Sequence, residues 1–286
     1  MELTMNVLLT CAGRRHYLAR YFRDALSGQG LLIGADMDPT APALAACDRS
    51  YQVPAVTSPD YINRIVEIIK GDDVQMVFSL SDLEVGLLAN SRRTIEAETG
   101  ASVFVPDLST YRICADKWET YNFCKGLGIP TIPTFLSVDD ALVALRNGLL
   151  RFPLIVKPRW GSASIGLTIV EDEISLQDSF NSCNKSISEG TLSSLGNSET
   201  VIIQQLIIGV EYGVDVLFSS RCEYHGFAAK LKLGMRSGET DRAVTAFPSR
   251  FQSLIETIAA SLRHRGNLDC DFLEQDGEIY LLEMNP

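Results

Sequence analysis

The sequence predicts an α/β protein in which a doubly wound parallel-sheet domain, residues 1–108, precedes an α+β domain, residues 109–286. The length of 286 residues corresponds to about two domains of ~150 residues each. In the first part of the chain, short apolar strands alternate with amphipathic helices, which is typical of βαβ units and a parallel sheet. In the second part, strands follow one another with Gly and Pro between them, which favours antiparallel pairing.

The first domain is predicted from a strand–turn–helix pattern that recurs along the chain. An apolar strand at 6–10 runs through a tight turn at Gly13 into a helix at 14–27, where apolar residues recur at helical spacing. The later elements are a strand at 31–35, a helix at 61–70, a strand at 74–80, a helix at 82–98 and a strand at 102–105.

The second domain begins with a predicted helix at 108–127, followed by paired strands at 131–136 and 154–157. Further strands are predicted at 167–170, 201–206, 213–218, 222–233, 268–273 and 278–282, with one helix at 248–264. The segment 182–200 is rich in Ser, Asn, Gly and Glu, which indicates a helix end followed by a mobile surface loop. No internal repeat is found.

Composition and charge exclude several classes of protein. Hydrophobic residues make up 46% and charged residues 21% of the chain, which is typical of a folded globular protein rather than a disordered one. The net charge of −11 disfavours nucleic acids and anionic membranes as partners, because both are negatively charged. No apolar stretch reaches the ~20 residues of a membrane span.

The chain start and the cysteines indicate a cytoplasmic location. The first residues lack a basic region and are interpreted as a first strand rather than a signal peptide. The seven cysteines are odd in number and scattered, without a C-x-x-C pair. We therefore expect a reducing compartment and no zinc site.

A candidate phosphate-binding segment follows the strand at 154–157. Lys157 ends this apolar strand, and a loop of small residues follows between Gly161 and Gly166. Backbone N–H groups of such a loop can approach an oxyanion while the ammonium lies beside them, which suits nucleotide phosphates. The segment is neither a Walker A loop nor a dinucleotide G-x-G-x-x-G motif. On its own it is also compatible with an ordinary turn and a surface lysine.

A second constellation lies at the C-terminal end. If the strands at 268–273 and 278–282 form a hairpin, the two-residue periodicity places Glu283 and Asn285 on one face, with Asp271 opposite them. Carboxylate and amide oxygens are ligands that Mg²⁺ takes together with water and phosphate oxygens. An acidic hairpin can also be a solvated face, but these acids lie within apolar runs, which favours a cation between them.

These motifs together resemble the ATP-grasp carboxylate–amine ligases. The segments CADKWETYNFCKGLGIPTIPTF, the Lys157 loop, IIQQLIIGVEYGVDV and DCDFLEQDGEIYLLEMNP occur in the order typical of that fold. LLTCAGRR, GADMDPTAPAL and CDRSYQVP resemble the preceding domain of the carbamoyl-phosphate-synthase-like branch. The resemblance covers essentially the whole chain and implies a pre-ATP-grasp domain, a small lid subdomain at 109–200 and a C-terminal nucleotide and metal subdomain at 201–286.

The resemblance implies ATP and one or two Mg²⁺ ions as cofactors, and it assigns roles to matching positions. The nucleotide-binding residues would be Lys117, Lys157, the flap residues Gly161, Ser162, Ser164 and Gly166, the linker residue Gln205, Leu206 with its backbone N–H on the adenine, and Glu211 on the ribose. The metal ligands would be Asp271, Glu283 and Asn285.

Two positions depart from the family pattern. Gln205 stands where Glu is frequent, although an amide can still bond to the purine edge or the linker. In the family an Arg normally follows the Asn-Pro pair, and this sequence ends at Pro286. We therefore expect the C-terminal subdomain to be truncated.

A basic strand supplies candidate catalytic cations. Alternation places Lys230, Lys232 and Arg236 on one face, before a turn at Gly238. A polar strand face in solvent is the alternative. If the strand lines the site, Lys232 and Arg236 would offset the charge that develops on phosphoryl transfer, at about 4 kcal/mol per contact near ~4 Å before desolvation.

Candidate substrate residues lie at the carboxyl ends of the first-domain strands, where open α/β sheets bind ligands. Arg14 and Arg15 follow the first strand at a helix start that favours an anion. Asp82 and Glu84 follow the strand at 74–80. Helix capping for Asp82 and a helix-dipole contact for Glu84 are the alternatives.

The predicted function is ATP-dependent ligation of a small-molecule carboxylate, such as an amino acid or related metabolite, to an amine. The carboxylate would be phosphorylated to an acyl phosphate, and ADP and phosphate would be released. Two alternatives stay open: a carbamoyl-phosphate-synthase-like half-enzyme acting on bicarbonate or carbamate, and a non-catalytic nucleotide-binding protein. A homodimer is also expected, because homo-oligomers are common among such enzymes.

Overall fold

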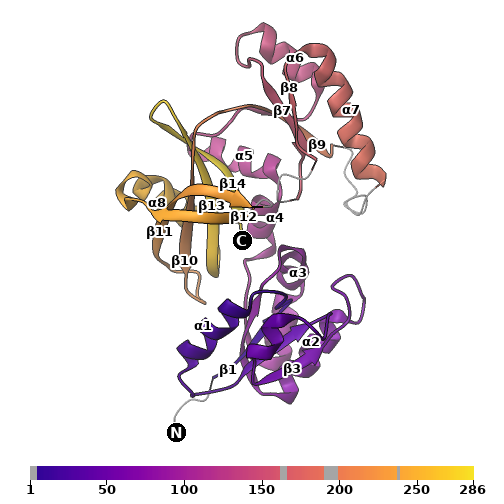
Figure 1. Ribbon diagram of the computed structural model, residues 1–286, viewed down its shortest axis with the longest axis vertical. Helices are drawn as coiled ribbons and strands as arrows, with labels where there is room; N and C mark the ends of the chain where they lie inside the picture. Colours follow the sequence, from indigo (N-terminus) through magenta and orange to yellow (C-terminus); the bar gives the residue numbers. More distant parts are fainter. Residues whose placement is uncertain (1–4, 162–165, 190–198, 237–238) are drawn as a thin grey trace.

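The computed structural model describes residues 5–161, 166–189, 199–236 and 239–286, and its strands form three separate sheets. Figure 1 shows the first sheet and its helices at the bottom, the large sheet of the C-terminal half at the left, and a small sheet with α6 and α7 at the top. Helices α4 and α5 lie between these parts. The functional site therefore depends on how segments far apart in the sequence meet.

The first sheet is parallel and has the strand order β3-β2-β1-β4-β5, which confirms the predicted doubly wound sheet. Its strands are β1 (Asn6–Thr10), β2 (Leu32–Asp36), β3 (Arg49–Gln52), β4 (Val74–Ser79) and β5 (Ser102–Phe104). The helices of this part are α1 (His16–Leu26), the 3-10 turn η1 (Pro42–Ala46), α2 (Tyr61–Gly71) and α3 (Asp82–Thr99). Strand β3 was not predicted because its residues are polar and mostly exposed.

The helix predicted at 108–127 is two helices, α4 (Leu108–Ala115) and α5 (Lys117–Leu127). They are separated by Asp116, whose backbone is extended, with φ −111° and ψ 108°. The Asp116 side chain accepts hydrogen bonds from the backbone N–H groups of Trp118 and Glu119, as a helix N-cap does. The interruption therefore places Lys117 at the first position of α5.

The small sheet is antiparallel, with the strand order β6-β9-β7-β8. Its strands are β6 (Thr134–Phe135), β7 (Leu154–Pro158), β8 (Thr168–Val170) and β9 (Val201–Gln205). Helices α6 (Val138–Arg146) and α7 (Glu173–Glu189) share an apolar core with this sheet. Strand β9 thus belongs to the small sheet rather than to the expected C-terminal subdomain, and the rest of the loop expected after α7, residues 190–198, lies outside the described residues.

The large sheet is antiparallel, with the strand order β12-β11-β10-β13-β14. Its strands are β10 (Val210–Phe218), β11 (Tyr224–Arg236), β12 (Glu239–Thr245), β13 (Gly266–Gln275) and β14 (Glu278–Asn285). The helix predicted at 248–264 is observed as the 3-10 turn η3 (Pro248–Arg250) and α8 (Gln252–Ser261).

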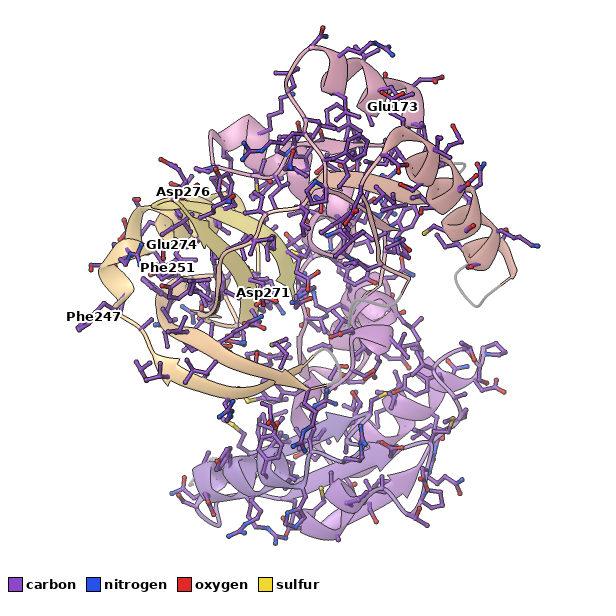
Figure 2. The ribbon with its side chains drawn as sticks, turned by 45° about the horizontal axis from the view of Figure 1, so that its top comes forward. Glu173, Phe247, Phe251, Asp271, Glu274 and Asp276 are labelled. Atoms are coloured by element: carbon purple, nitrogen blue, oxygen red, sulfur yellow. The ribbon has the colours of Figure 1, made fainter. Side chains whose placement is uncertain are left out.

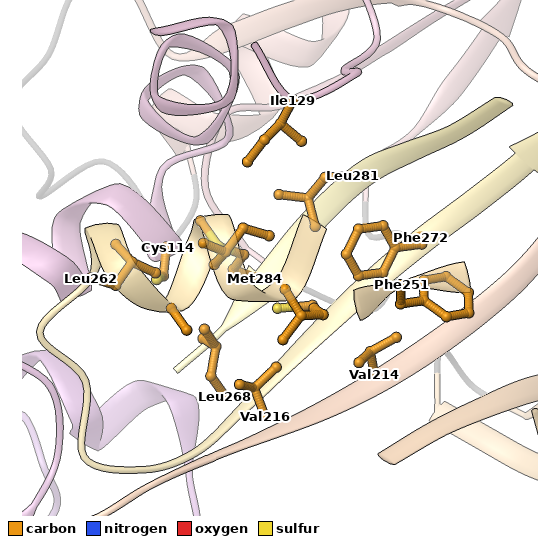
Figure 3. Packing of buried hydrophobic residues seen from close by; sticks show 14 of the residues in the cluster. Cys114, Ile129, Val214, Val216, Phe251, Leu262, Leu268, Phe272, Leu281 and Met284 are labelled. Carbon is orange, nitrogen blue, oxygen red and sulfur yellow. The ribbon is translucent and has the colours of Figure 1, made fainter. Parts of the chain in front are cut away.

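The two faces of the large sheet differ in chemistry, because successive side chains on a strand point to opposite faces. On one face Val214, Val216 and Phe272 pack with residues of α8 and with Cys114 of α4 in a single buried core (Figure 3). The opposite face carries charged side chains on four adjacent strands. An antiparallel sheet can therefore have one face in the core while the other forms a polar site.

Among the described residues, none of the helices combines the length and the apolar character that crossing a bilayer requires. All seven cysteines are free thiols. Burial raises the pKa of the Cys114 and Cys124 thiols to about 12, so both behave as small apolar core residues.

Candidate active site

A cleft of about 400 Å³ lies between the small sheet and the polar face of the large sheet. Its charged lining residues come from α5, β7, β10, β11, β13 and β14: Lys117, Lys157, Glu211, Lys232, Asp271 and Glu283. Its other lining residues include Ile132, Ile155, Trp160, Gly161, Gln204, Gln205, Leu206, Ile207, Met235, Leu273 and Leu282. Lys157 and Glu283, which are far apart in the sequence, therefore line the same cavity.

The two lysines of the predicted phosphate site come from different elements and line the same cleft. Lys117 begins α5, and its Nζ donates a hydrogen bond of 2.5 Å to the carbonyl of Gly161. Lys157 lies near the end of β7. Burial lowers the pKa of both ammonium groups, and burial together with the nearby Lys117 charge lowers the pKa of Lys157 to about 8. Closely spaced, partly desolvated cations favour a multivalent anion.

The carboxylates of Asp271 and Glu283 lie on neighbouring strands at paired positions. The register of β13 and β14 pairs Asp271 with Glu283 and Asp269 with Asn285. Figure 2 shows Asp271 toward the middle of the molecule, whereas Phe247 points outward at its edge. The cross-strand convergence predicted from alternation is thus observed. Like charges directly opposite each other destabilise a sheet, so this arrangement favours a cation nearby.

Lys232 provides part of that positive charge. Its Nζ lies 2.5 Å from Asp271 Oδ1, and its side chain is only 6% exposed. Lys117 Nζ lies 3.9 Å from Glu283 Oε2. Asp271 is therefore next to the Lys232 ammonium and Glu283 next to the Lys117 ammonium, while the two carboxylates are neighbours across the strands.

The acidic pair fits a magnesium ion whose other ligands are water and phosphate oxygens. Among the described residues, no group of three or more His, Cys, Asp and Glu side chains is gathered closely enough to enclose a metal. Mg²⁺ is usually bound through one or two carboxylates, with water and phosphate oxygens as its other ligands. Asp271 and Glu283 satisfy that requirement, with Asn285 beside them on the same face of β14.

Gly213 of β10 allows the lysines of β11 to reach the carboxylates of β13. The register places Gly213 between Lys230 of β11 and Asp271 of β13. A Cβ atom at position 213 would lie 2.6 Å from Lys230 Cε and 3.4 Å from Lys232 Cε. The absent side chain leaves the space through which both lysines cross β10. Lys230 Nζ lies 3.6 Å from Asp269 of β13, across β10, and 2.8 Å from Asp215 Oδ2 of β10 itself.

The expected adenine contact of Leu206 is wrong, because its backbone N–H donates to the carbonyl of Pro153 at 3.2 Å. The adjacent residue Ile207, which sequence reasoning missed, also lines the cleft. Gln205 lines it too, with its amide bonded to backbone groups of Arg151 and Pro153. These contacts join chain segments that no local sequence pattern brings together.

Arg236 does not lie with Lys232, contrary to the sequence prediction. Its side chain is 80% exposed, its Nε lies 3.7 Å from Asp241 Oδ1, and Met235 lines the cleft in its place. The register of β11 with β12 shifts on both sides of Gly234, and these irregularities interrupt the simple alternation of side chains.

Glu84 has a structural role rather than the substrate contact predicted for it. It is fully buried, and its carboxylate accepts hydrogen bonds from Thr10 Oγ1, Ser79 Oγ and Tyr61 OH at 2.6 to 2.7 Å. A carboxylate satisfied by three hydroxyl groups has little capacity left for a ligand.

The other predicted residues of the first domain lie apart from the cleft. Arg14 and Asp82 are exposed, and Arg15 Nη1 donates to the carbonyl of Leu80 at 2.7 Å.

Of the flap residues, Gly161 lines the cleft and Gly166 has a positive φ of 76°. Ser162 and Ser164 lie outside the described residues.

A small and a large antiparallel sheet that face each other across a cleft, with lysines and carboxylates inside it, define the ATP-grasp class of folds. The chain belongs to the ATP-grasp family: the family described as "ATP-grasp domain" matches residues 114–286. The family described as "PylC-like, N-terminal domain" matches residues 7–104.

Individual relatives agree with this assignment. D-alanine–D-alanine ligase B of Chromobacterium violaceum is 30% identical over an alignment of 192 residues that covers 60% of this chain and 57% of the relative. The biotin carboxylase domain of Hydrogenobacter thermophilus 2-oxoglutarate carboxylase, solved with MgADP and bicarbonate, has a TM-score of 0.76 at 18% identity and covers 100% of this chain and 64% of that one. The L-amino acid ligase of Bacillus licheniformis has a TM-score of 0.72 at 16% identity, with coverage of 100% and 69%. The chain spans about half the length of the curated relatives it matches.

Proposed function

We propose that the chain binds Mg·ATP in the cleft and uses it to join a small-molecule carboxylate to an amine. The observation that carries this proposal is the shared cavity in which Lys117 and Lys157 face the Asp271–Glu283 pair. Family membership and similarity to a D-alanine–D-alanine ligase and an L-amino acid ligase support the reaction type.

In this proposal the lysines bind phosphate oxygens, and Asp271, Glu283 and Asn285 hold one or two magnesium ions. The bound metal would neutralise charge on the terminal phosphates. The backbone N–H of Ile207, rather than that of Leu206, would be the donor to the base, and Glu211 would accept hydrogen bonds from the ribose. Gly161 would help to cover the phosphates. All these positions except Asn285 line the cleft.

The reaction would have two steps. A carboxylate oxygen attacks the γ-phosphorus of ATP, the bond to the bridging oxygen breaks, and an acyl phosphate and ADP result. The amine then attacks the acyl carbon, phosphate leaves, and the nitrogen loses a proton. The protein contributes mainly positioning and charge compensation. The buried ammonium of Lys232 next to the acidic pair is placed to offset charge on the transferred group.

The substrates would bind next to the metal end of the cleft. Arg14, Arg15 and Asp82, at the carboxyl ends of the first-domain strands, do not line the cleft themselves but stay candidate contacts, and Arg14 and Asp82 are exposed. We also propose a cytoplasmic location, which the free cysteines support, and a homodimer.

Measuring ADP release from ATP tests this proposal. The assay would use a panel of amino acids and related carboxylates, each with and without an amine, and a separate series with bicarbonate. ADP formation that requires both an acid and an amine is expected. Dependence on bicarbonate alone would assign the chain to a bicarbonate-phosphorylating reaction of the carbamoyl-phosphate type, and nucleotide binding without turnover would refute an enzymatic role.

A further inference from the structure

Arg159 is a buried arginine that lies behind the cleft, two residues after Lys157. Its side chain is only 9% exposed, and its Nε donates a hydrogen bond of 2.7 Å to Asp116 Oδ1, whose side chain is 10% exposed. Arg159 is not among the cleft-lining residues. Neither the family resemblance nor the proposed reaction assigns it a role.

Further contacts fix the guanidinium in one orientation. Its Nη2 lies 3.5 Å from Glu119 Oε1, and its Nη1 donates to the carbonyl of Glu199 at 3.4 Å. The guanidinium carbon stacks over the ring of Trp160, 4.8 Å from its centre. Arginine suits this position because its planar group presents several donors in a fixed geometry.

The backbone of Arg159 joins the same segments. Its N–H donates to the carbonyl of Thr200 at 2.9 Å, and its carbonyl accepts a hydrogen bond of 3.2 Å from the N–H of Lys117. Asp116 immediately precedes Lys117 and caps α5. The side-chain pair and the backbone bond therefore fasten the start of α5 to the end of β7.

These two segments carry the two lysines of the phosphate site, and their ammonium groups repel each other. Both are largely buried, and burial strengthens repulsion between like charges. Glu283 compensates one of them at 3.9 Å. Without a bound anion, the remaining repulsion tends to separate α5 from β7, and the Asp116–Arg159 pair opposes that separation.

We infer that Arg159, through its ion pair with Asp116, is a positioning residue that holds Lys117 and Lys157 at the spacing required by a nucleotide diphosphate. The inference rests on the proposed function for the identity of the ligand. It adds that part of the nucleotide affinity is determined by a residue that does not touch the nucleotide.

Calorimetric titration of the full chain with MgADP tests this inference without requiring turnover. In Arg159→Gln the dissociation constant is expected to rise about 10- to 100-fold, because losing a residue that orients the groups in contact with a ligand typically has effects of that order. Asp116→Asn should reproduce the loss, since asparagine still caps a helix but cannot form the ion pair. The double variant should be little worse than either single one, because both remove the same interaction.

Arg92→Gln is the matched control. The Arg92 side chain is 7% exposed and is also ion-paired with an aspartate, Asp107, but it lies in α3, away from the cleft. This variant should lose thermal stability to an extent comparable with Arg159→Gln and keep its MgADP affinity within about twofold. Arg159→Lys retains the positive charge but not the planar guanidinium, so it should bind MgADP with intermediate affinity. It replaces the glutamine variant in the test if that variant does not fold.

Wild-type affinity in folded Arg159→Gln or Arg159→Lys would overturn the inference while leaving the proposed function intact. An equal loss of affinity in Arg92→Gln would also overturn it, because the effect would then be general destabilisation. A wild-type chain that bound no MgADP would refute the proposed function and this inference with it.

Discussion

Lys117 Nζ lies 3.9 Å from Glu283 Oε2, which joins the first residue of α5 to the acidic pair of the C-terminal hairpin. The contact brings together one group from each half of the proposed site, the phosphate-binding cations and the metal-binding carboxylates. In the absence of a nucleotide, these opposite charges partly neutralise each other. When Mg·nucleotide binds, the phosphates would neutralise the Lys117 ammonium and the metal would neutralise the Glu283 carboxylate.

Lys117→Ala should weaken MgADP binding about 10- to 100-fold, because a hydrogen bond to a charged group contributes about 1.5 to 3 kcal/mol. Calorimetric titration measures the change. Lys125→Ala is the control, since Lys125 is exposed on the same helix and lies over Tyr121. Equal affinities for the two variants would contradict the placement of phosphates at the start of α5.

Glu283→Gln should increase the Mg²⁺ concentration needed for half-maximal nucleotide binding by at least about tenfold, because one of two carboxylate ligands is lost. A magnesium titration at fixed ADP gives that midpoint. Glu278→Gln, at the exposed start of the same strand, should leave it unchanged. Equal midpoints for wild type and Glu283→Gln would show that the acidic pair is not the metal site.

Gly213→Ala should reduce turnover at least about tenfold with little loss of stability, since the added Cβ meets flexible lysine ends rather than backbone. Lys230 and Lys232 would then move away from the carboxylates of β13. Turnover and thermal melting are measured together. Gly126→Ala in α5, where a Cβ has open space, is the matched control and should not reduce turnover. A Gly213→Ala variant as active as wild type would show that the lysine positions do not matter.

His264 should make stability depend on pH. It is buried, and burial lowers its pKa to about 4, below the value of about 6.5 expected in the unfolded chain. As the pH falls, the unfolded state binds the proton first, so stability is lost between pH ~6.5 and ~4, by at most about 3 kcal/mol. Denaturant unfolding of His264→Leu should lack this component, whereas exposed His225→Asn should retain it. Parallel profiles for wild type and His264→Leu would contradict the prediction.

Local periodicity was sufficient to predict the parallel sheet and the face shared by Asp271 and Glu283. Both depend on alternation within strands, which the order of residues determines directly. The joint placement of the lysines and carboxylates in one cleft followed from the resemblance to the ATP-grasp ligases, since no local pattern relates the two groups. The roles of these residues in binding and catalysis stay predictions.

Features that depend on tertiary contacts or on irregular backbone could not be predicted. The register shifts around Gly234 expose Arg236, and three hydroxyl groups from different segments enclose Glu84. The backbone bond of Leu206 to Pro153 likewise joins strands that pair only in the folded chain. The sequence does not single out Arg159, because an arginine after a strand is usually a surface residue, and only its burial reveals the ion pair with Asp116.

The most direct test of the central claim is a crystal structure of the chain with Mg²⁺ and a nonhydrolysable ATP analogue. We predict that the phosphates lie between Lys117 and Lys157, and that the metal bridges them to Asp271 and Glu283. An analogue bound elsewhere, or bound in the cleft with its phosphates away from these four side chains, would contradict the account.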